Sequence, residues 1–297
     1  MNYVISEDGT KIAYYQYGKG DAIFIFNGFS CSEQNIFEIV QKLSKKYRVI
    51  FFDYKGHGNS GSPKVLDDVT LESAVKDAKK IFDLLKIKKA HLIGYSTGVQ
   101  VMLEFHAQNS KIARSLVCIS GFSEKVLDSF LNTKTKFFSY ITPKLNILTK
   151  KFRKPFESGW KLVHSLPFEL RLFVAAKIFL NEKKTKKAVV QPFLDSLKNL
   201  DPSLLVHFIV DVNNHKLSKP IEGIKIPTLV MCGEKDLFAP IEKSKEIHEK
   251  IKHSKFLQIP NASHNVVQEE PELIASTILK FLNKITKKVV AKKKVNA

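Results

Sequence analysis

The sequence predicts an α/β fold with a mostly parallel central sheet, helices on both faces and an inserted helical cap. Short apolar runs alternate with segments whose apolar residues recur at helical spacing, as in buried parallel strands joined by crossover helices. The first two runs, Tyr3–Ser6 and Lys11–Tyr17, flank the turn Glu7-Asp8-Gly9 and predict a β-hairpin at an antiparallel edge. The alternation stops between Phe122 and Lys219, where Phe and Leu recur at helical spacing.

The remaining elements follow in order along the chain. The expected strands after the hairpin are apolar runs that end in polar or glycine-containing loops: Ala22–Phe26, Arg48–Asp53, Ala90–Ile93, Ala113–Ser120, Ile226–Cys232 and Lys255–Ile259. The expected core helices each carry one apolar face: Ser32–Leu43, Thr70–Leu85, Thr97–Gln108, Ile241–Lys252 and Pro271–Ile285. Within the insertion, the spacing predicts a helix over Val163–Leu180, broken at Pro167, and another over Ser203–Val212.

These elements divide the chain into three parts. Residues 1–121 and 220–286 are expected to form an α/β core, and residues 122–219 a helical cap, or lid, over the strand ends. Residues 287–297 are a lysine-rich tail that we expect to be frayed.

Composition favours a folded cytoplasmic protein. The 297 residues are 44% hydrophobic and 26% charged. No apolar run reaches the ~18 residues that a membrane-spanning helix needs, and the N-terminal segment lacks the pattern of a signal peptide. Cys31, Cys118 and Cys232 are too few, and odd in number, for a disulfide framework.

The net charge of +19 is concentrated in two places and is almost all lysine. Residues 121–219 carry 18 Lys and Arg against 8 Asp and Glu, and residues 284–297 carry 6 Lys and no acid. The simpler interpretation, which we favour, is a solvated surface, and the sharper one is weak attraction to an anionic membrane surface or an acidic substrate. Nucleic acid is not an expected partner, because arginine is scarce and no Walker loop, zinc-finger spacing or RNA-binding motif occurs.

A Gly-x-Ser-x-Gly pentapeptide, Gly94–Gly98, lies where an apolar strand turns into a predicted helix. In that context the small flanking residues permit a sharp elbow, which projects Ser96 above the sheet at a helix N-terminus. The sequence therefore predicts that Ser96 is a nucleophile rather than a residue of an ordinary turn.

A serine hydroxyl needs a base, and the base needs an orienting acid. Of the nine histidines, His264 lies in a loop directly after an apolar strand, where catalytic groups of α/β folds gather. Glu234 and Asp236 lie in the loop after the preceding strand, and either could reach that histidine. Along the chain, the candidate serine, acid and histidine therefore occur in that order, and each follows a different predicted strand.

With these motifs the chain resembles the α/β-hydrolase fold family across nearly its whole length. The resemblance implies that Asp236 rather than Glu234 is the acid, and that the stretch containing His57 is a structural turn without a catalytic role. The residues that carry the resemblance are the elbow Gly94–Gly98, the Gly-x-x-Asp loop Gly233–Asp236, the histidine loop Asn261–His264 and Asp53–Ser60, in which Lys55 replaces the family's arginine.

The resemblance also implies an oxyanion hole made of two backbone N–H groups. One belongs to Thr97, which follows the nucleophile, and the other to Phe29 in the loop after the third strand. Asn27 stands in that loop where the family usually has histidine. Since the donor is a main-chain group, this replacement need not abolish the hole, although it alters how the loop is braced.

The expected function is hydrolysis of a small-molecule carboxylic ester by a Ser96–His264–Asp236 triad, without cofactor or metal. Relatives that open epoxides or remove halides use an aspartate at the elbow, from which Ser96 departs. Two alternatives stay open: a thioester, lactone or carbon–carbon bond hydrolase with the same triad, and a non-catalytic ligand-binding scaffold. Phenylalanines crowd the insertion, and we expect most of them to form its core and a few to line an apolar acyl pocket: Phe130, Phe137, Phe138, Phe152, Phe156, Phe168, Phe173 and Phe179.

Overall fold

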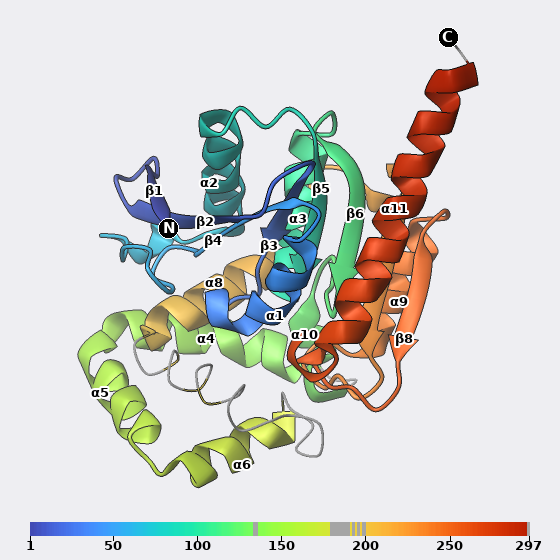
Figure 1. Cartoon of the computed structure of the whole chain (residues 1–297). Helices are drawn as coiled ribbons and strands as arrows, with labels where there is room; N and C mark the ends of the chain where they lie inside the picture. The colour runs from blue at the N-terminus through green and yellow to red at the C-terminus, as the bar shows by residue number, and fades with distance from the viewer. Residues whose placement is uncertain (133–135, 179–190, 192–193, 195–196, 198–199, 296–297) are drawn as a thin grey trace.

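A computed structural model of the chain describes residues 1–132, 136–178, 191, 194, 197 and 200–295 (Figure 1). Its centre is an eight-stranded sheet with the order β1-β2-β4-β3-β5-β6-β7-β8. The first two strands are antiparallel to their neighbours, and all later pairs are parallel, so the predicted α/β fold with a mostly parallel sheet is confirmed. The strands are β1 (Asn2–Ile5), β2 (Lys11–Tyr17), β3 (Ala22–Phe26), β4 (Arg48–Phe52), β5 (Ala90–Tyr95), β6 (Ala113–Ile119), β7 (Thr228–Gly233) and β8 (Lys255–Ile259).

Helices cover both faces of the sheet, because successive side chains of each buried strand point to opposite sides. In β3, Ile23 and Ile25 pack on one face, whereas Phe24 and Phe26 pack on the other. The first face is covered by α1 (Glu33–Leu43) and α11 (Pro271–Val295), and the second by α2 (Leu71–Leu84), α3 (Thr97–Gln108) and α9 (Ile241–Lys250). The remaining short elements are α10 (Val266–Glu269) and 3-10 turns at Leu66–Asp68, Val126–Asp128, Phe130–Asn132 and Ile221–Gly223.

Several element boundaries differ from the sequence-based expectation by one to a few residues, and two of the differences have identifiable reasons. The seventh strand begins at Thr228 rather than Ile226, because Pro227 has no N–H to offer a strand ladder. The last helix continues to Val295 instead of fraying after Ile285. No Gly or Pro follows Ile285 to end it, and lysine and alanine are good helix formers.

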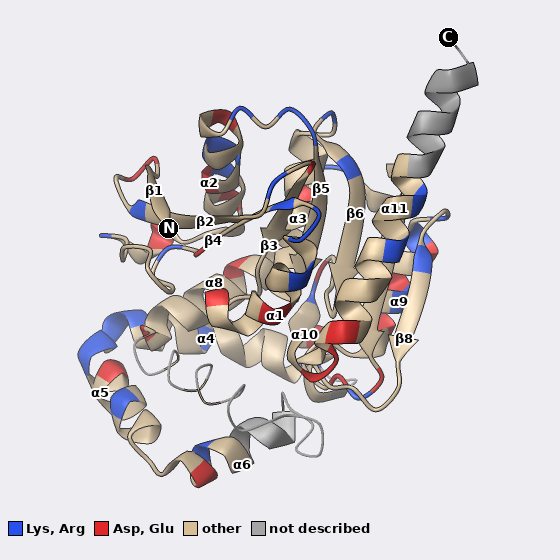
Figure 2. Cartoon of the chain, in the orientation of Figure 1, with Lys and Arg blue, Asp and Glu red and all other residues tan. Residues whose placement is uncertain are grey.

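Between β6 and β7 lies a segment of helices, which we call the helical insertion. Its helices are α4 (Phe137–Lys151), α5 (Arg153–His164), α6 (Phe168–Ile178) and α8 (Pro202–Asn214). Ser165–Pro167 separates α5 from α6, close to the break predicted at Pro167. In Figure 1 the insertion lies beside one end of the sheet, the same end near which α10 lies. Figure 2 shows Lys and Arg along α4, α5 and α6.

The expectation that most phenylalanines of the insertion form its own core is wrong for the described residues. Phe137, Phe152 and Phe173 are exposed, and Phe156 and Phe168 are only half-buried. Among the described elements, α4 and α5 pack mainly on α8 and on each other, which leaves Phe137 and Phe152 uncovered. Phe179 lies outside the described residues. Within the part of the chain that is described, no helix is long and apolar enough to cross a membrane.

Candidate active site

Ser96 occupies a sharp turn between β5 and α3. Its backbone is held at φ +55° and ψ −126°, a conformation that L-residues rarely adopt. Two backbone hydrogen bonds fix the turn: Ser96 N donates to the Ile119 carbonyl at 2.8 Å, and Val99 N donates to the Ser96 carbonyl at 3.0 Å. The strained residue is therefore held from the adjacent strand and from the first turn of the helix.

The two glycines of the pentapeptide are required by close backbone contacts. A Cβ atom on Gly98 would lie 2.1 Å from the Phe26 carbonyl oxygen, and one on Gly94 would lie 2.6 Å from Val99 Cα. Both distances are far below van der Waals contact, and both neighbours are backbone atoms that cannot move aside. The elbow can form only because neither position carries a side chain.

Ser96, His264 and Asp236 form a continuous hydrogen-bonded chain. Ser96 Oγ lies 2.9 Å from His264 Nε2, and His264 Nδ1 lies 2.8 Å from Asp236 Oδ2. The loops after β5, β7 and β8 supply these side chains, all of which are buried. Because the carboxyl ends of parallel strands meet at one edge of the sheet, three residues distant in sequence converge there.

The loop after β7 distinguishes its two acids. The Asp236 carboxylate is buried, and its Oδ1 accepts hydrogen bonds from Phe238 N at 3.0 Å and Ala239 N at 2.8 Å, which leaves Oδ2 for the imidazole. The Glu234 side chain is exposed and accepts a hydrogen bond from Asn261 N at 2.9 Å. The structure thus brings Asp236, not Glu234, against the histidine.

Phe29 and Thr97 lie with Ser96 on the wall of one cavity. Among the described residues, the backbone N–H of neither Phe29 nor Thr97 donates to a protein acceptor. The Thr97 amide belongs to the first turn of α3, where such groups are ordinarily unpaired and carry partial positive charge. Two donors suited to a developing oxyanion are therefore available beside the hydroxyl.

Asn27 braces the loop that carries Phe29. Its side-chain oxygen accepts a hydrogen bond from Gly28 N at 2.9 Å, and its amide nitrogen donates to the Ser32 carbonyl at 3.2 Å. The Asn27 carbonyl in turn accepts from the Tyr54 hydroxyl at 2.8 Å. The asparagine that replaces the family's histidine thus bridges both ends of the loop.

Tyr95 is a site residue that the sequence analysis missed. Its hydroxyl lies 3.2 Å from the His264 carbonyl oxygen and 3.1 Å from Asn265 Oδ1, and its ring stacks near the His264 ring at 5.9 Å between centroids. Burial raises the pKa of the Tyr95 hydroxyl, which keeps the group a hydrogen-bond donor. In the sequence, Tyr95 is only the variable second residue of the Gly-x-Ser-x-Gly motif, and that position alone does not predict contacts with the histidine loop.

The cavity above Ser96 has a volume of about 320 Å³ and is mostly apolar. Two of the predicted phenylalanines, Phe130 and Phe138, line it together with Trp160, whose Nε1–H is bonded to the Leu197 carbonyl at 2.7 Å. The wall includes Cys31, but burial raises the pKa of that thiol to about 12, so it is protonated at neutral pH. Further apolar wall residues are Leu127, Leu197, Leu205, Val206, Ile209 and Phe238.

The Asp53–Ser60 stretch forms a braced turn. Asp53 Oδ2 accepts hydrogen bonds from the Tyr15 hydroxyl and from Asn59 N, each at 2.8 Å. Lys55 is buried and reaches Asp8 Oδ2 at 3.1 Å, so it ties the turn to the first hairpin. His57 packs edge-on against Phe29 at 4.2 Å between ring centroids, and burial lowers its pKa to about 4, so it is neutral at pH 7.

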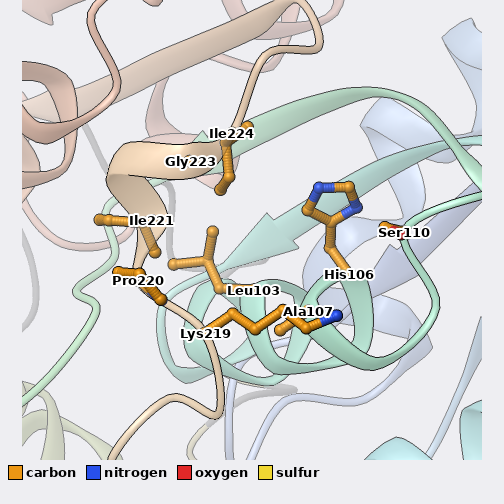
Figure 3. Close-up of a pocket in the computed structure, with 9 residues that line it drawn as sticks. All are labelled: Leu103, His106, Ala107, Ser110, Lys219, Pro220, Ile221, Gly223 and Ile224. Atoms are coloured by element: carbon orange, nitrogen blue, oxygen red, sulfur yellow. The ribbon is translucent and has the colours of Figure 1, made fainter.

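A second cavity, of about 280 Å³, lies at the C-terminal end of α3 (Figure 3). His106 and Lys219 are its titratable wall residues, and burial lowers the pKa of His106. Ser110 also lines it, but no hydrogen bond joins that hydroxyl to His106 among the described residues. This cavity therefore lacks the serine–histidine pair of the larger one. In the described ranges, no cluster of three His, Cys, Asp or Glu side chains could hold a metal ion.

Comparison with known proteins agrees with this architecture. A family model described as the alpha/beta hydrolase fold matches residues 21–271, and the chain belongs to that family. An AB hydrolase superfamily protein of Bacillus subtilis is 24% identical over 95% of this chain and 99% of its own length. A human monoacylglycerol lipase is 23% identical over 89% of this chain and 76% of its own length.

Among solved structures, a thermophilic esterase from Thermogutta terrifontis superposes with a TM-score of 0.73. The superposition covers 96% of this chain and 99% of the esterase, at 19% sequence identity, which is evidence of a shared fold. The chain is accordingly a hydrolase of the alpha/beta fold family with esterase- and lipase-like relatives.

Proposed function

We propose that this chain is a serine hydrolase that cleaves carboxylic esters of fairly apolar acyl or aryl substrates through an acyl-enzyme on Ser96. The observation that carries the proposal is the hydrogen-bonded chain from Ser96 Oγ through the His264 ring to Asp236, at 2.9 and 2.8 Å. That arrangement matches the nucleophile, base and orienting acid that acyl transfer needs.

In the first half of the proposed reaction, Ser96 Oγ attacks the ester carbonyl while His264 Nε2 takes the hydroxyl proton. The Asp236 carboxylate, which accepts from Nδ1, stabilises the imidazolium that results. The tetrahedral intermediate then expels the alcohol, which receives the proton from Nε2. Water attacks the acyl-serine with His264 as base, and collapse of the second intermediate releases the carboxylic acid and restores Ser96.

The Phe29 and Thr97 N–H groups are the proposed donors to the oxyanion of both intermediates. Their lack of protein acceptors among the described residues supports this role. Fixed donors stabilise charge that develops only in the transition state, and loss of one donor typically costs on the order of 100-fold or more in rate.

The substrate class follows from the cavity. Phe130, Phe138 and Trp160 surround the space above Ser96 with apolar surface, which suits an acyl chain or aryl ring better than a charged peptide. The names of the relatives, a monoacylglycerol lipase and an esterase, point to the same bond type. We propose accordingly that residues 122–219 act as a cap on a core made of residues 1–121 and 220–286.

A serine-directed fluorophosphonate probe and a panel of p-nitrophenyl esters of increasing acyl length test the proposal. We expect the wild-type chain to be labelled and to hydrolyse the esters, with a preference for acyl chains that fill the cavity. Ser96→Ala should lose both properties while keeping its thermal unfolding midpoint. Ser110→Ala removes a hydroxyl from the second cavity and is the matched control, which should be labelled like the wild type.

Two outcomes would overturn the proposal. If folded Ser96→Ala is still labelled and active, the nucleophile is another residue. If the wild type neither reacts with the probe nor turns over any ester, the chain is a ligand-binding scaffold that keeps the fold.

A further inference from the structure

The helical insertion exposes an unusual number of large apolar side chains. In the described part of the chain, most exposed large apolar residues lie on α4–α6 and the turns between them. Ile147 and Leu162 are each 69% exposed, and Tyr140 is 67% exposed. The other members are Phe137, Ile141, Leu145, Leu148, Phe152, Val163, Leu166, Leu170 and Phe173. Large apolar groups exposed in such number on neighbouring helices are typical of an interaction site.

The exposed residues of α4 follow the helical repeat, which shows that they share one side of the helix. Phe137, Ile141 and Leu148 recur at intervals of four and seven residues and are exposed, as is Phe152 at the C-cap. On an adjoining side of the helix, Phe138 and Thr142 line the cavity above Ser96, and Thr149 is buried. One helix therefore presents one side to the cavity and another side to the surroundings.

The segment that carries this surface is strongly basic. Residues 136–173 contain eight Lys and Arg but only two Glu, although Lys150 pairs with Asp67 and Arg153 with Asp201. Lys144 lies over the Tyr140 ring at 3.7 Å, and Lys151 lies over the Phe152 ring at 5.5 Å. Figure 2 shows Lys and Arg on each of α4, α5 and α6. Cations beside exposed aromatic and aliphatic groups are typical of segments that lie in the headgroup region of a membrane.

We propose that this outer face of α4–α6 binds the surface of an anionic lipid membrane. The apolar side chains would enter the boundary between headgroups and acyl chains, while Lys144 and Lys151 would contact anionic headgroups. The predominance of lysine over arginine favours a diffuse anionic surface over a partner read by bidentate contacts. Binding of this kind does not require the proposed chemistry at Ser96, because none of these exposed side chains lines the catalytic cavity.

Co-sedimentation of the full chain with lipid vesicles tests this proposal. One set of vesicles is phosphatidylcholine alone, and the other contains phosphatidylcholine and phosphatidylglycerol in equal parts. We expect clear binding to the anionic set, weaker binding to the neutral set, and loss of the difference when salt shortens the Debye length from ~10 Å at 0.1 M to ~3 Å at 1 M.

Two pairs of variants distinguish the contribution of the outer face to vesicle binding from the effects of overall charge and overall hydrophobicity. Lys144→Glu with Lys151→Glu should weaken anionic binding by more than about 30-fold, since loss of each lysine near such a surface costs about fivefold and the two added carboxylates are repelled by it. Lys45→Glu with Lys46→Glu makes the same charge change just before β4, at the other end of the strands, and should weaken it far less. Phe137→Ser with Leu148→Ser should weaken binding to both vesicle sets, whereas Phe37→Ser on α1 should not.

Parallel measurements keep the result independent of the proposed hydrolysis. Circular dichroism establishes that each variant is folded, and Ser96→Ala should bind vesicles like the wild type. Equal sedimentation with neutral and anionic vesicles at low salt would overturn the proposal, as would equal losses in the two double-lysine variants. Self-association that Phe137→Ser with Leu148→Ser abolishes, without vesicle binding by the wild type, would instead assign the face to a second copy of the chain.

Discussion

Asp236 holds His264 through a single carboxylate oxygen, with Oδ2 lying 2.8 Å from Nδ1 of the ring. The other oxygen is occupied by the N–H groups of Phe238 and Ala239, so the carboxylate cannot rotate freely. The geometry directs Nε2 toward Ser96 Oγ at 2.9 Å. Orientation of the imidazole is therefore set by the loop after β7, which among the described residues makes no hydrogen bond to Ser96, the proposed nucleophile.

The first prediction concerns the choice of acid. Asp236→Asn should lower kcat on a soluble aryl ester on the order of 1,000-fold or more, because an amide cannot both hold Nδ1–H and stabilise the imidazolium. Glu234→Gln is the matched control from the same loop and should leave kcat within a few-fold of the wild type. If Glu234→Gln is the crippling change and Asp236→Asn is mild, the acid has been assigned to the wrong residue.

The second prediction concerns Tyr95 as a positioning residue. Tyr95→Phe removes the hydroxyl that lies 3.2 Å from the His264 carbonyl and 3.1 Å from Asn265 Oδ1. We expect kcat to fall about tenfold with little change in KM, because the loop of the base loosens while the cavity keeps its shape, and stability should fall by about 1–2 kcal/mol. Tyr14→Phe, in the core on β2, is the control. A change in KM alone would contradict a positioning role.

The fold could be predicted from sequence because its information is local. Buried strands such as Ala22–Phe26 are continuous apolar runs, and Thr70 marks its helix as an N-cap whose side chain accepts a hydrogen bond from Ser73 N at 3.0 Å. The loops carrying Ser96, Asp236 and His264 could be located for the same reason, since each directly follows such a run. Their convergence then follows from parallel topology alone.

The exposure of the insertion's side chains and the contacts that hold the candidate site in place could not be predicted in the same way. Spacing identifies a helix but does not say how many of its sides are covered, so the exposure of Phe137 and Phe173 was not predictable. The contacts of Tyr95 join it to residues about 170 positions away in the sequence, and those of Asn27 depend on how one loop bends. Both are properties of tertiary structure.

The third prediction tests the brace on the proposed oxyanion loop. Asn27→Ala removes the acceptor for Gly28 N and the donor to the Ser32 carbonyl, which should displace the Phe29 N–H. We expect kcat to fall on the order of 10- to 100-fold, with a smaller effect on KM. Asn27→Asp keeps the acceptor and should recover part of the rate. Unchanged kcat in Asn27→Ala would show that the loop holds its shape without this side chain.

The fourth prediction compares two glycines by thermal or denaturant unfolding. Gly98→Ala should destabilise the chain by more than about 3 kcal/mol, because the new Cβ would lie 2.1 Å from the Phe26 carbonyl oxygen. Gly159→Ala, in α5, meets nothing within 4 Å and should stabilise the helix by about 0.5–1 kcal/mol. Similar effects of the two substitutions would contradict the tight strand-to-helix packing at the elbow.

The last prediction is a pH dependence of stability that originates at Asp53. Burial raises the pKa of this carboxyl to about 6, and its Oδ1 has no hydrogen-bond partner in the described part of the chain. Since the ordinary value is 3.8, the folded state binds more protons than the unfolded state between about pH 4 and pH 6. The free energy of unfolding that Asp53 contributes therefore decreases as pH rises through that window.

Asp53→Asn does not titrate and can still accept from Tyr15 and Asn59, so it should escape this loss. The difference in unfolding free energy, variant minus wild type, should rise from pH 4 to pH 7 by at most about 3 kcal/mol. Urea unfolding of both proteins at a series of pH values measures the difference, which cancels the titration of groups common to both. A difference that stays constant or shrinks over this range would show that Asp53 is charged and well solvated in the folded chain.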